Sequence, residues 1–310
     1  MAGQITDKEL EEIYSFAVQL GKDAGKILMD RAQLRMSGPV QKEEQKFVEK
    51  ENAVDIVTQT DTDVEAFIHS AITKKYPHHK FIGEETYSAG SSKDYLITPA
   101  DPTWCVDPLD GTVNYTHLFP MFCVSIAFIV SGQPVIGVIY APFLNQLFTS
   151  CKGKGAWLNE TQSLPLIKGA PIPANAPKGC TFSCEWGKDR RDPDAGEGNL
   201  GRKIESFVTM AVEAQGRGGK GGMVHGGCWE WDVAAGIALL HEAGGLVTTA
   251  NPPANPETAE ITEVKLGSRL YLAIRPAGPS EKETGRQGQE RLVREVWKRV
   301  KSLDYSRPGA

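Results

Sequence analysis

The sequence has no long apolar run and no excess of positive charge. No segment reaches the roughly 18 consecutive apolar residues that a membrane-spanning helix requires, and the longest candidate, Met121 to Val130, has the length of a β-strand. The 34 Lys and Arg residues are outnumbered by 39 Asp and Glu residues, which gives a formal net charge of -5. Such a charge provides no general attraction to nucleic acids or anionic membranes. We therefore expect no binding to either, and an anionic ligand would need positive charge supplied within its site.

Cysteines with the spacing of a metal site are also lacking. The six cysteines are scattered, and the nearest pair, Cys180 and Cys184, has no matching second pair. The N-terminal stretch "MAGQITDKELEEIYSF" is polar and acidic, without the basic and apolar regions of a signal peptide. Reduced structural thiols in a cytoplasmic protein are the expectation.

Several catalytic signatures are missing as well. The sequence has no Ser-His-Asp elbow, no nicotinamide fingerprint and no Walker loop. The glycine-rich stretch "GRGGKGG" at 216–222 follows no predicted strand and precedes no helix-opening Ser or Thr, so we interpret it as a flexible turn.

The first half of the chain shows helical periodicity followed by strand patterns. Thr6 and Glu9 form a predicted capping box before a helix that continues past Leu28. A second helix is predicted from a cap at Asp61 or Thr62 to the Tyr76-Pro77 pair. The polar segment 37–52 is predicted to be a loop or an edge hairpin. Residues 123–159 contain apolar stretches broken by turn sequences, which is typical of antiparallel strands. Helices followed by a largely antiparallel sheet predict an α+β layered fold.

The second half is expected to form a separate part after a Pro- and Ala-containing linker. A helix is predicted over 200–214, and another opens near Asp232 and closes at Gly244-Gly245 before a strand. The last helix is predicted from Ser280, with Glu283 as its capping partner and an apolar stripe that packs on the protein. The predicted parts are 1–160, 175–276 and the charged C-terminal helix 277–310.

Two acids lie close together where the apolar strand "TWCVD" ends. Pro108 restricts the backbone so that Asp107 and Asp110 flank a turn, where each carboxylate raises the pKa of the other unless a cation neutralises them. Oxygen ligands without histidine favour Mg²⁺, and the Leu109 carbonyl could add a further oxygen. Taken alone, the same sequence is equally typical of a turn with an Asx cap.

The residues that follow suit an anion. Gly111 and Thr112 begin a predicted helical turn whose N-H groups would face a phosphate. Cation and helix start therefore complement each other.

Three further acidic clusters each admit a structural and a functional interpretation. Glu84-Glu85 ends a short apolar strand and could be a solvated loop pair or metal ligands. Asp232 follows "CWEW" and could cap a helix, bind a metal or do both. Asp61 could cap its helix or act as a base toward Thr112. The coincidence of these four acidic clusters indicates hard cations that activate a water and orient an anionic ester, as in hydrolysis of a phosphate monoester.

At these residues the sequence resembles the inositol monophosphatase family, a Mg²⁺-dependent and lithium-sensitive group of sugar phosphatases. The resemblance covers most of residues 10–160 and 228–250, in the blocks "DIVTQTD", "FIGEET", "WCVDPLDGTVNYTHLFPMFCVSIAF", "CKGKGAWLN" and "WDVAAGIALLHEAGG". It implies the layered αβαβα sandwich of that family.

The resemblance also implies roles for single residues. Two metal ions would be held, with Asp107 shared between them, and a third ion bound more loosely; the implied ligands are Glu84, Asp107, the Leu109 carbonyl, Asp110 and Asp232, with Glu85 in support.

A second group of residues would serve the substrate. Thr112, polarised by Asp61, would orient the attacking water, while the Gly111 and Thr112 amides receive the phosphate. Lys50 matches a lysine near the entrance of the site, and Asn114 follows the helix start as in the family.

The resemblance breaks at "GGMVHGGCWEWD". Family members have a run of the Arg-Ser-x-Gly-Ser type, a helix and a strand before the Trp-Asp motif, on the order of 20 to 30 residues by usual element lengths. Here that run is absent, and His225 stands seven residues before Asp232, where the family has an acid. The absent run carries the family's main contacts to the sugar ring.

Three explanations of this break stay open. The chain is a short isoform or the product of a misjudged exon boundary, a phosphatase with an altered sugar pocket, or a binding or regulatory protein. Loss of a strand would expose apolar surface, so we predict low solubility and weak activity for the chain as written.

The resemblance leaves the alcohol half of the ester open. The glycine-rich stretch before the break, the sequence "GGCWEWD" and the charged C-terminal helix are similar to fungal members, some of which accompany quinate-utilisation genes. A sugar or cyclitol phosphate, with inositol 1-phosphate foremost, is the expected substrate; lithium is the expected inhibitor, and a homodimer is the expected assembly.

Overall fold

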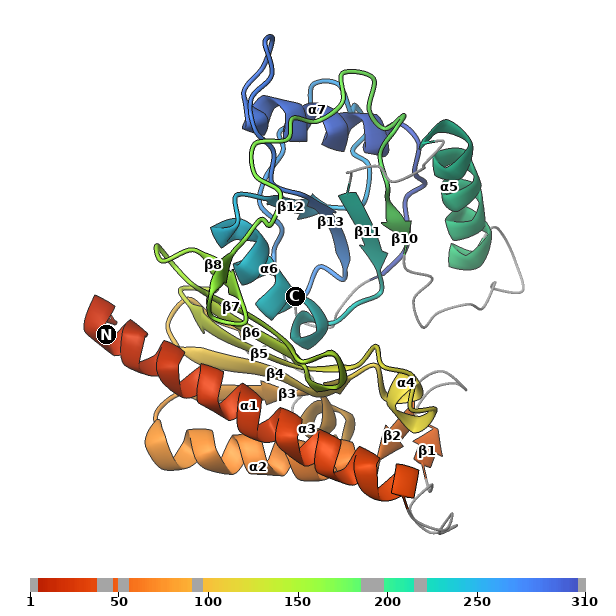
Figure 1. Cartoon of the computed structure of the whole chain (residues 1–310). Coiled ribbons are helices and arrows are strands. Elements are labelled where there is room, and N and C mark those ends of the chain that lie inside the picture. The colour runs from red at the N-terminus through yellow and green to blue at the C-terminus, as the bar shows by residue number, and fades with distance from the viewer. Residues whose placement is uncertain are drawn as a thin grey trace. The chain divides into compact units, whose positions relative to one another are not determined.

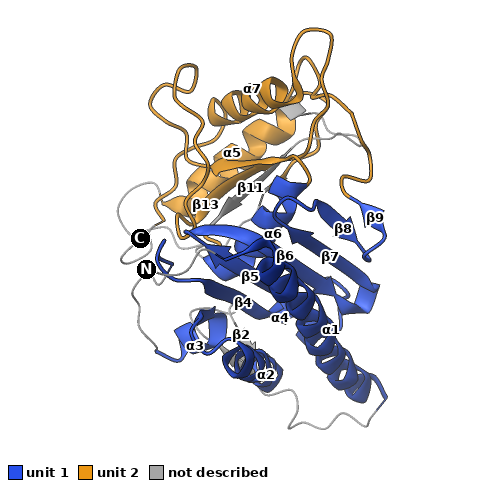
Figure 2. Cartoon of the chain, turned by 90° about the vertical axis from the view of Figure 1, so that its left-hand side faces the viewer, with its two compact units in different colours: residues 1–163, 230–242, 309 blue, residues 164–229, 243–308, 310 orange. Residues whose placement is uncertain are grey.

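The computed structural model describes residues 5–37, 47–49, 56–90, 97–184, 198–214 and 222–305. Contacts divide the chain into two compact units, coloured separately in Figure 2. The first unit comprises residues 1–163 and 230–242, and the second comprises 164–229 and 243–308. The domain boundaries drawn from the sequence stay a prediction; the units differ from them in that 230–242 joins the first unit.

The first helix, α1 (Asp7–Ser37), begins with the predicted capping box. The Thr6 backbone N-H donates to Glu9 Oε2 at 2.8 Å, and the Glu9 N-H donates to Thr6 Oγ1 at 3.3 Å. The buried side chains of α1 recur every three or four residues, as the sequence periodicity indicated.

Helix α2 (Gln59–Lys75) begins earlier than predicted. Its cap is Thr58, and Asp61 stands at the third helical position, where it completes a capping box. The predicted cap at Asp61 or Thr62 is therefore wrong, because the Thr58 hydroxyl already occupies that role. The predicted end at Tyr76 is confirmed.

Much of segment 37–52 lies outside the described residues. The part that is described, β1 (Phe47–Glu49), pairs antiparallel with β2 (Ile56–Thr58). The glycine-rich turn predicted at 216–222 also falls outside the described residues, except for Gly222.

A seven-stranded sheet forms the centre of the first unit. Only the pair β3 (Lys80–Gly83) and β4 (Thr103–Asp110) is parallel; every later pair is antiparallel. The strands that follow in order are β5 (Cys123–Val130), β6 (Gln133–Ala141), β7 (Gln146–Cys151), β8 (Ala156–Leu158) and β9 (Gln162–Ser163). The predicted antiparallel strands are thus confirmed. Short helices follow three of the strands: α3 (Glu84–Ser88), α4 (Thr112–Thr116) and the 3-10 turn η1 (Pro142–Leu144).

Helices cover both faces of this sheet. Figure 1 shows α1 and α2 side by side along one face. The other face contacts α6 (Glu230–Glu242), which begins two residues before the predicted Asp232. Alternate residues of β6 face the two layers: a Cβ on Gly21 of α1 would meet Val138, whereas Gly137 lies against the Ala235 carbonyl of α6.

The second unit is built on a four-stranded sheet in the order β10 (Ser183–Cys184), β11 (Gly222–Gly226), β13 (Leu270–Ile274) and β12 (Leu246–Thr249). Helix α7 (Gly285–Trp297) packs against β13 and buries its apolar stripe, including Leu292 and Val296, as predicted. Its cap is Thr284, which forms a capping box with Gln287, so the predicted cap at Ser280 with Glu283 is wrong.

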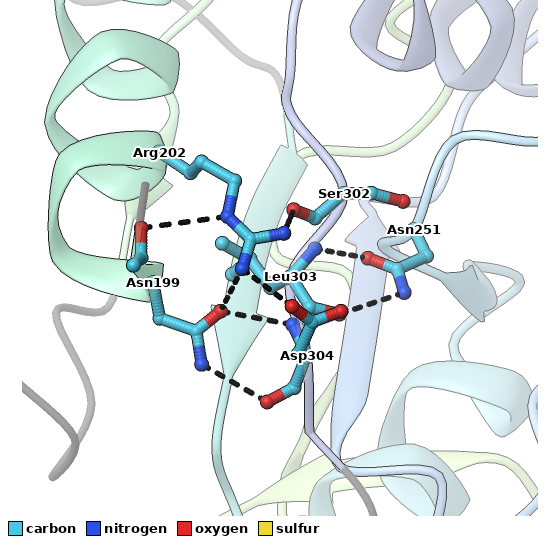
Figure 3. Close-up of polar contacts among 7 residues, drawn as sticks. Asn199, Arg202, Asn251, Ser302, Leu303 and Asp304 are labelled. Atoms are coloured by element: carbon cyan, nitrogen blue, oxygen red, sulfur yellow. Dashed lines mark hydrogen bonds and ion pairs between the residues drawn. The ribbon is translucent and has the colours of Figure 1, made fainter. Parts of the chain in front are cut away.

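Helix α5 (Asn199–Ala214) matches the predicted helix over 200–214. Its polar side forms hydrogen bonds with the segment 302–304, which we call the C-terminal strap. Figure 3 shows the side-chain amides of Asn199 and Asn251, each paired with the backbone of one residue of this strap. Asn199 exchanges two hydrogen bonds of 2.9 Å with Asp304, and Asn251 exchanges two, of 2.8 and 3.0 Å, with Leu303. Arg202 adds a bond to the Ser302 carbonyl and an ion pair with Asp304.

One apolar stripe of α5 is exposed, although Met210 of the same helix is buried. The side chains of this stripe keep 40 to 66% of their surface accessible: Ile204, Phe207, Val208 and Val212. Among the described residues, no helix is long and apolar enough to cross a membrane. Helices layered on a mixed sheet confirm the predicted α+β layered fold.

Candidate active site

The site begins where two parallel strands end together. Gly83 of β3 pairs with Val106 of β4, so Glu84 and Asp107 follow at the same edge of the sheet. The carboxyl ends of parallel strands are where sites in layered folds commonly lie.

A β-bulge separates Asp107 from Asp110. On β4 and β5, Asp107 pairs with Ser125 and Asp110 pairs with Cys123, so one extra residue lies on β4. The sequence predicted a turn here; the strand instead continues through Asp110, because the bulge accommodates Pro108 within it. The Leu109 N-H donates to Asp107 Oδ1 at 3.0 Å, so the Asx-type bond expected of this sequence is present as well.

Asp107 is a buried carboxyl with a strongly perturbed pKa. The residue is 2% exposed, and burial raises its pKa well above the ordinary value. Neighbouring carboxylates raise that pKa further, in the order Glu84, Asp110 and Asp232. The structure therefore places the carboxylates of three other predicted metal ligands close enough to buried Asp107 to raise its pKa.

The negative charges of the same carboxylates also affect the pKa of the Cys123 thiol. Burial raises its pKa well above the usual value, and the carboxylates of the site raise it further. Its sulfur lies 3.9 Å from Asp110 Oδ2, where a protonated thiol donates to the carboxylate.

Gly111 and Thr112 stand where helix α4 begins. Gly111 caps α4 with φ of 90°, a left-handed conformation that favours glycine, and a Cβ there would lie 2.8 Å from the Met121 carbonyl. The Thr112 hydroxyl lies 2.9 Å from Asp61 Oδ1 and 3.1 Å from the Leu109 carbonyl. A hydroxyl has one proton to donate, so the two oxygens compete for it.

Asp61 connects helix α2 to Thr112 at the start of α4. Its Oδ2 accepts from the Thr58 N-H at 3.0 Å, while Oδ1 accepts from Thr112. The side chain is 1% exposed, and burial raises its pKa to about 6 against the lowering effect of these hydrogen bonds. From the sequence, Asp61 could be the helix cap or the partner of Thr112. In the structure it is the partner of Thr112, and it supports the Thr58 cap from the third helical position without being the cap itself.

Helix α6 places Asp232 in its first turn, two residues after the helix begins. The Ser125 hydroxyl donates to the Trp231 carbonyl at 3.2 Å, and the Tyr87 and Trp231 rings lie 5.1 Å apart. These contacts tie the start of α6 to β5 and α3.

The remaining predicted residues are placed differently. Glu85 is buried on α3, so a solvated loop pair does not describe it. Asn114 donates its side-chain amide to the Met121 carbonyl at 2.7 Å. Lys50 lies outside the described residues.

The donor set suits a hard divalent cation in chemical type, because it offers carboxylate and carbonyl oxygens and a charge that needs compensation. Within the described ranges, however, no three His, Cys, Asp or Glu side chains are close enough to hold a metal ion as they stand. Binding would require Glu84, Asp110 or Asp232 to converge further on Asp107. The assignment of these residues as metal ligands stays a prediction.

Three residues of the site escaped the sequence analysis: Glu65, Ser125 and Cys123. Glu65 lies on the buried face of α2, one turn after Asp61, and an acid within an apolar stripe was the available signal. Ser125, a polar residue inside an apolar strand, offered a similar one.

Comparisons with known proteins agree with this geometry. The sequence matches the inositol monophosphatase family over residues 9–301. It is 36% identical to inositol monophosphatase 2 of Saccharomyces cerevisiae, over 84% of this chain and 87% of that protein. Among solved structures, inositol monophosphatase from Anabaena (Nostoc) sp. PCC 7120 superposes with a TM-score of 0.65 at 24% identity, over 96% of this chain and 98% of that one.

A more similar relative is the quinic acid degradation cluster protein x of Neurospora crassa. It is 64% identical, and the alignment covers 98% of each chain. That alignment spans 337 positions, whereas this chain has 310 residues, so at least 27 positions have no residue here. This lower bound is compatible with an absent segment of the expected size; that the positions form one run before Gly226 stays a prediction.

Proposed function

The chain belongs to the inositol monophosphatase family, and from that premise we propose that it is a Mg²⁺-dependent phosphatase that hydrolyses a phosphate monoester. One observation carries the proposal. Buried Asp107, its acidic neighbours on α3, α6 and β4 itself, and the Thr112–Asp61 pair lie at one edge of the sheet. A group of acids this concentrated is stable in ionised form only with a cation.

The metal assignment follows the chemistry of the donors. Glu84, Asp107 and the Leu109 carbonyl would hold one ion, while Asp107, Asp110 and Asp232 would hold a second. A third ion near Glu84, supported by Glu85, completes the set. Mg²⁺, when bound, supplies a Lewis acid that polarises the ester and favours ionisation of water.

The chain's own residues orient the reactants. When Asp61 is ionised, the Thr112 hydroxyl donates to it in preference to the neutral Leu109 carbonyl, because charged acceptors bind more strongly. The lone pairs of Thr112 Oγ1 can then accept a hydrogen bond from the attacking water and so orient it. The N-H groups of Gly111 and Thr112, at the start of α4, would donate to the phosphate oxygens.

Inositol 1-phosphate is the substrate we propose first, with another sugar or cyclitol phosphate as the wider class. Asn114 and Lys50 are proposed near this substrate. Lithium, a hard cation with the same preference for oxygen ligands, is the proposed inhibitor. The resemblance also supports a homodimer.

Phosphate release from inositol 1-phosphate, measured with and without Mg²⁺, tests the proposal. We expect release that depends on Mg²⁺ and is inhibited by Li⁺. Asp110→Asn should lower it roughly 100-fold or more, as loss of one charge-stabilising group does in other sites. Asp23→Asn on α1, which removes an acid that pairs with Gln19, should leave it unchanged. No metal-dependent release from the parent chain would rule out the enzyme.

A binding or regulatory protein linked to quinate metabolism is the second candidate. The observation in its favour is the 64% identity to a quinic acid degradation cluster protein, compared with 36% to the yeast phosphatase. This candidate predicts quinate or a related cyclitol acid bound without turnover, which calorimetry on the chain used for the assay would detect.

A further inference from the structure

We propose that Glu65 is a positioning residue of the site: its carboxylate fixes the first turn of α3 and so places Glu84 beside Asp107. The inference rests on the proposed function, in which Glu84 is a metal ligand. Glu65 itself faces backbone donors and takes no part as a ligand.

Helix α3 cannot cap itself. Its N-cap residue is Gly83, which has no side chain to accept the free N-H groups of the first turn. Glu65, on α2, supplies the acceptors instead. Its Oε2 accepts from the Glu85 N-H at 2.7 Å, and its Oε1 accepts from the Thr86 N-H at 2.7 Å. These are the second and third helical positions, which a normal N-cap side chain would serve.

The hydroxyl of Thr86 adds a third donor, again to Glu65 Oε1. With the residue only 4% exposed, the carboxylate is satisfied by these three bonds rather than by solvent. Charge-assisted bonds to a buried carboxylate are the stronger class, so the first turn of α3 is rigidly attached to α2.

Glycine at position 83 is part of this arrangement. A Cβ there would lie well inside 3.0 Å of the Glu65 carboxyl group, closer than real Cβ contacts. The conformation of Gly83 is ordinary and extended, so the glycine serves close approach and not backbone freedom.

Helix α2 carries two site-facing acids one turn apart. Asp61 contacts Thr112, and Glu65 caps α3. One turn further on, the exposed His69 ring stacks on Phe81 of β3 at 4.4 Å and adds a second contact between α2 and β3. The helix thereby fixes both the partner of Thr112 and the strand–helix junction that bears Glu84. Since the charge of Glu84 is the largest neighbouring influence on the pKa of Asp107, movement of α3 would be felt at the centre of the site.

Glu65→Gln is the primary test. Glutamine keeps the shape but offers one acceptor oxygen and places an amide among N-H donors. The probe is Mg²⁺ alone, titrated into the full chain while the melting temperature is followed, because a cation that binds the folded state raises it. We expect the apparent affinity for Mg²⁺ to fall roughly 10-fold, the size typical of residues that orient metal ligands.

Glu9→Gln is the matched control. Glu9 is also a carboxylate that serves a helix start, through Thr6, but it lies on α1 and is exposed. This variant should lower the melting temperature without changing the dependence on Mg²⁺. Thr86→Val, which removes one of the three donors at constant shape, is the milder variant should Glu65→Gln fail to fold; it should weaken Mg²⁺ binding by a smaller factor.

Glu84→Gln separates the two proposals. If it leaves Mg²⁺ binding unchanged, the proposed ligand role of Glu84 fails. If it weakens binding while Glu65→Gln and Thr86→Val bind like the parent, the positioning role is wrong. If both proposals hold, the double variant Glu65→Gln/Glu84→Gln is no weaker than Glu84→Gln alone, because Glu65 acts through Glu84.

Discussion

Asp61 is a residue whose two oxygens serve different elements. Oδ2 closes the capping box of α2 by accepting from Thr58, and Oδ1 accepts from the hydroxyl of Thr112 on α4. Burial nevertheless raises the pKa of this carboxyl to about 6. Above that pH the protein pays to keep an ionised acid in its interior, and the proposed chemistry requires that ionised form.

The pH dependence of stability should reveal this cost. The pKa is 3.8 as the ordinary value and about 6 in the folded chain, so the folded state holds the proton longer than the unfolded state. Stability from that proton is complete below pH 3.8 and is lost as pH rises to about 6. Asp61→Asn has no carboxyl to titrate at this position. Its free energy of unfolding should therefore rise relative to that of the parent by about 2 to 3 kcal/mol as the pH increases from 4 to 6.

Urea unfolding of both proteins across this range measures the difference. A constant offset between parent and variant from pH 4 to pH 7 would contradict the raised pKa. The variant should also lose phosphatase activity at pH 7, since Asn accepts a weaker hydrogen bond from Thr112.

Single residues show what sequence could and could not indicate. Asp107 and Asp110 were identifiable because both stand in one short stretch, and Thr112 because it directly follows. Glu65 was not, since its partners are backbone N-H groups some 20 residues away along the chain. Only the packing of α2 against α3 brings them together.

At the scale of elements, the position of α6 depends on one glycine of the sheet. Gly137 of β6 lies so close to the Ala235 carbonyl that a Cβ would overlap the α6 backbone. Because α6 carries Asp232, this contact sets how near that acid lies to the strands that bear Asp107 and Asp110.

Gly137→Ala should therefore push α6 away from the sheet. We expect a destabilisation of about 1 to 3 kcal/mol, the usual range for overpacking, together with weaker Mg²⁺ binding. The control is Gly236→Ala, one residue after Ala235 on the same helix, where a Cβ meets nothing within 4 Å. Alanine there should stabilise by about 0.5 to 1 kcal/mol. Equal melting temperatures for the two variants would contradict the tight contact.

Element boundaries show why local patterns predict some starts and miss others. The periodicity of α1 and the apolar stretches with intervening turns in β5 to β7 are local patterns, and both elements of structure were predicted. Before α7, two capping patterns overlap: Ser280 with Glu283, and Thr284 with Gln287. In the structure the first forms a turn in which the Ser280 N-H donates to the Glu283 carbonyl, and the second caps the helix. Sequence alone does not distinguish them, because the choice depends on where α7 packs.

At the scale of the whole molecule, the exposed apolar stripe of α5 (Ile204, Phe207, Val208 and Val212) is unfavourable for solubility. Contiguous apolar patches on a surface promote association. The polar side of the helix cannot turn outward in exchange, because Asn199 and Arg202 are engaged by the C-terminal strap. Low solubility stays a prediction, and the exposed apolar side chains of α5 support it by a route other than the loss of a strand.

Charge placed on the stripe should improve solution behaviour. Val208→Lys/Val212→Lys is expected to shift the chain from aggregates toward a single species in size-exclusion chromatography, without loss of helix in circular dichroism. Leu34→Lys, at an exposed position on α1, should have little effect. Unchanged aggregation in the α5 variant would show that the stripe is not responsible.

The predicted weak activity has its own test. Phosphate release by the parent at the rate of a family member that has the absent run would contradict it.

The membership of α6 in the first unit also has a consequence in time. During synthesis, residues 164–229 must be made after the sheet is complete and before the helix that covers its second face appears. At about 5 to 20 residues per second, that interval lasts roughly 3 to 13 seconds. For those seconds the nascent sheet has an apolar face open to chaperones or to neighbouring chains. Asp232 is the last of the predicted metal ligands to be synthesised, so the site cannot assemble before residues 164–229 have been made.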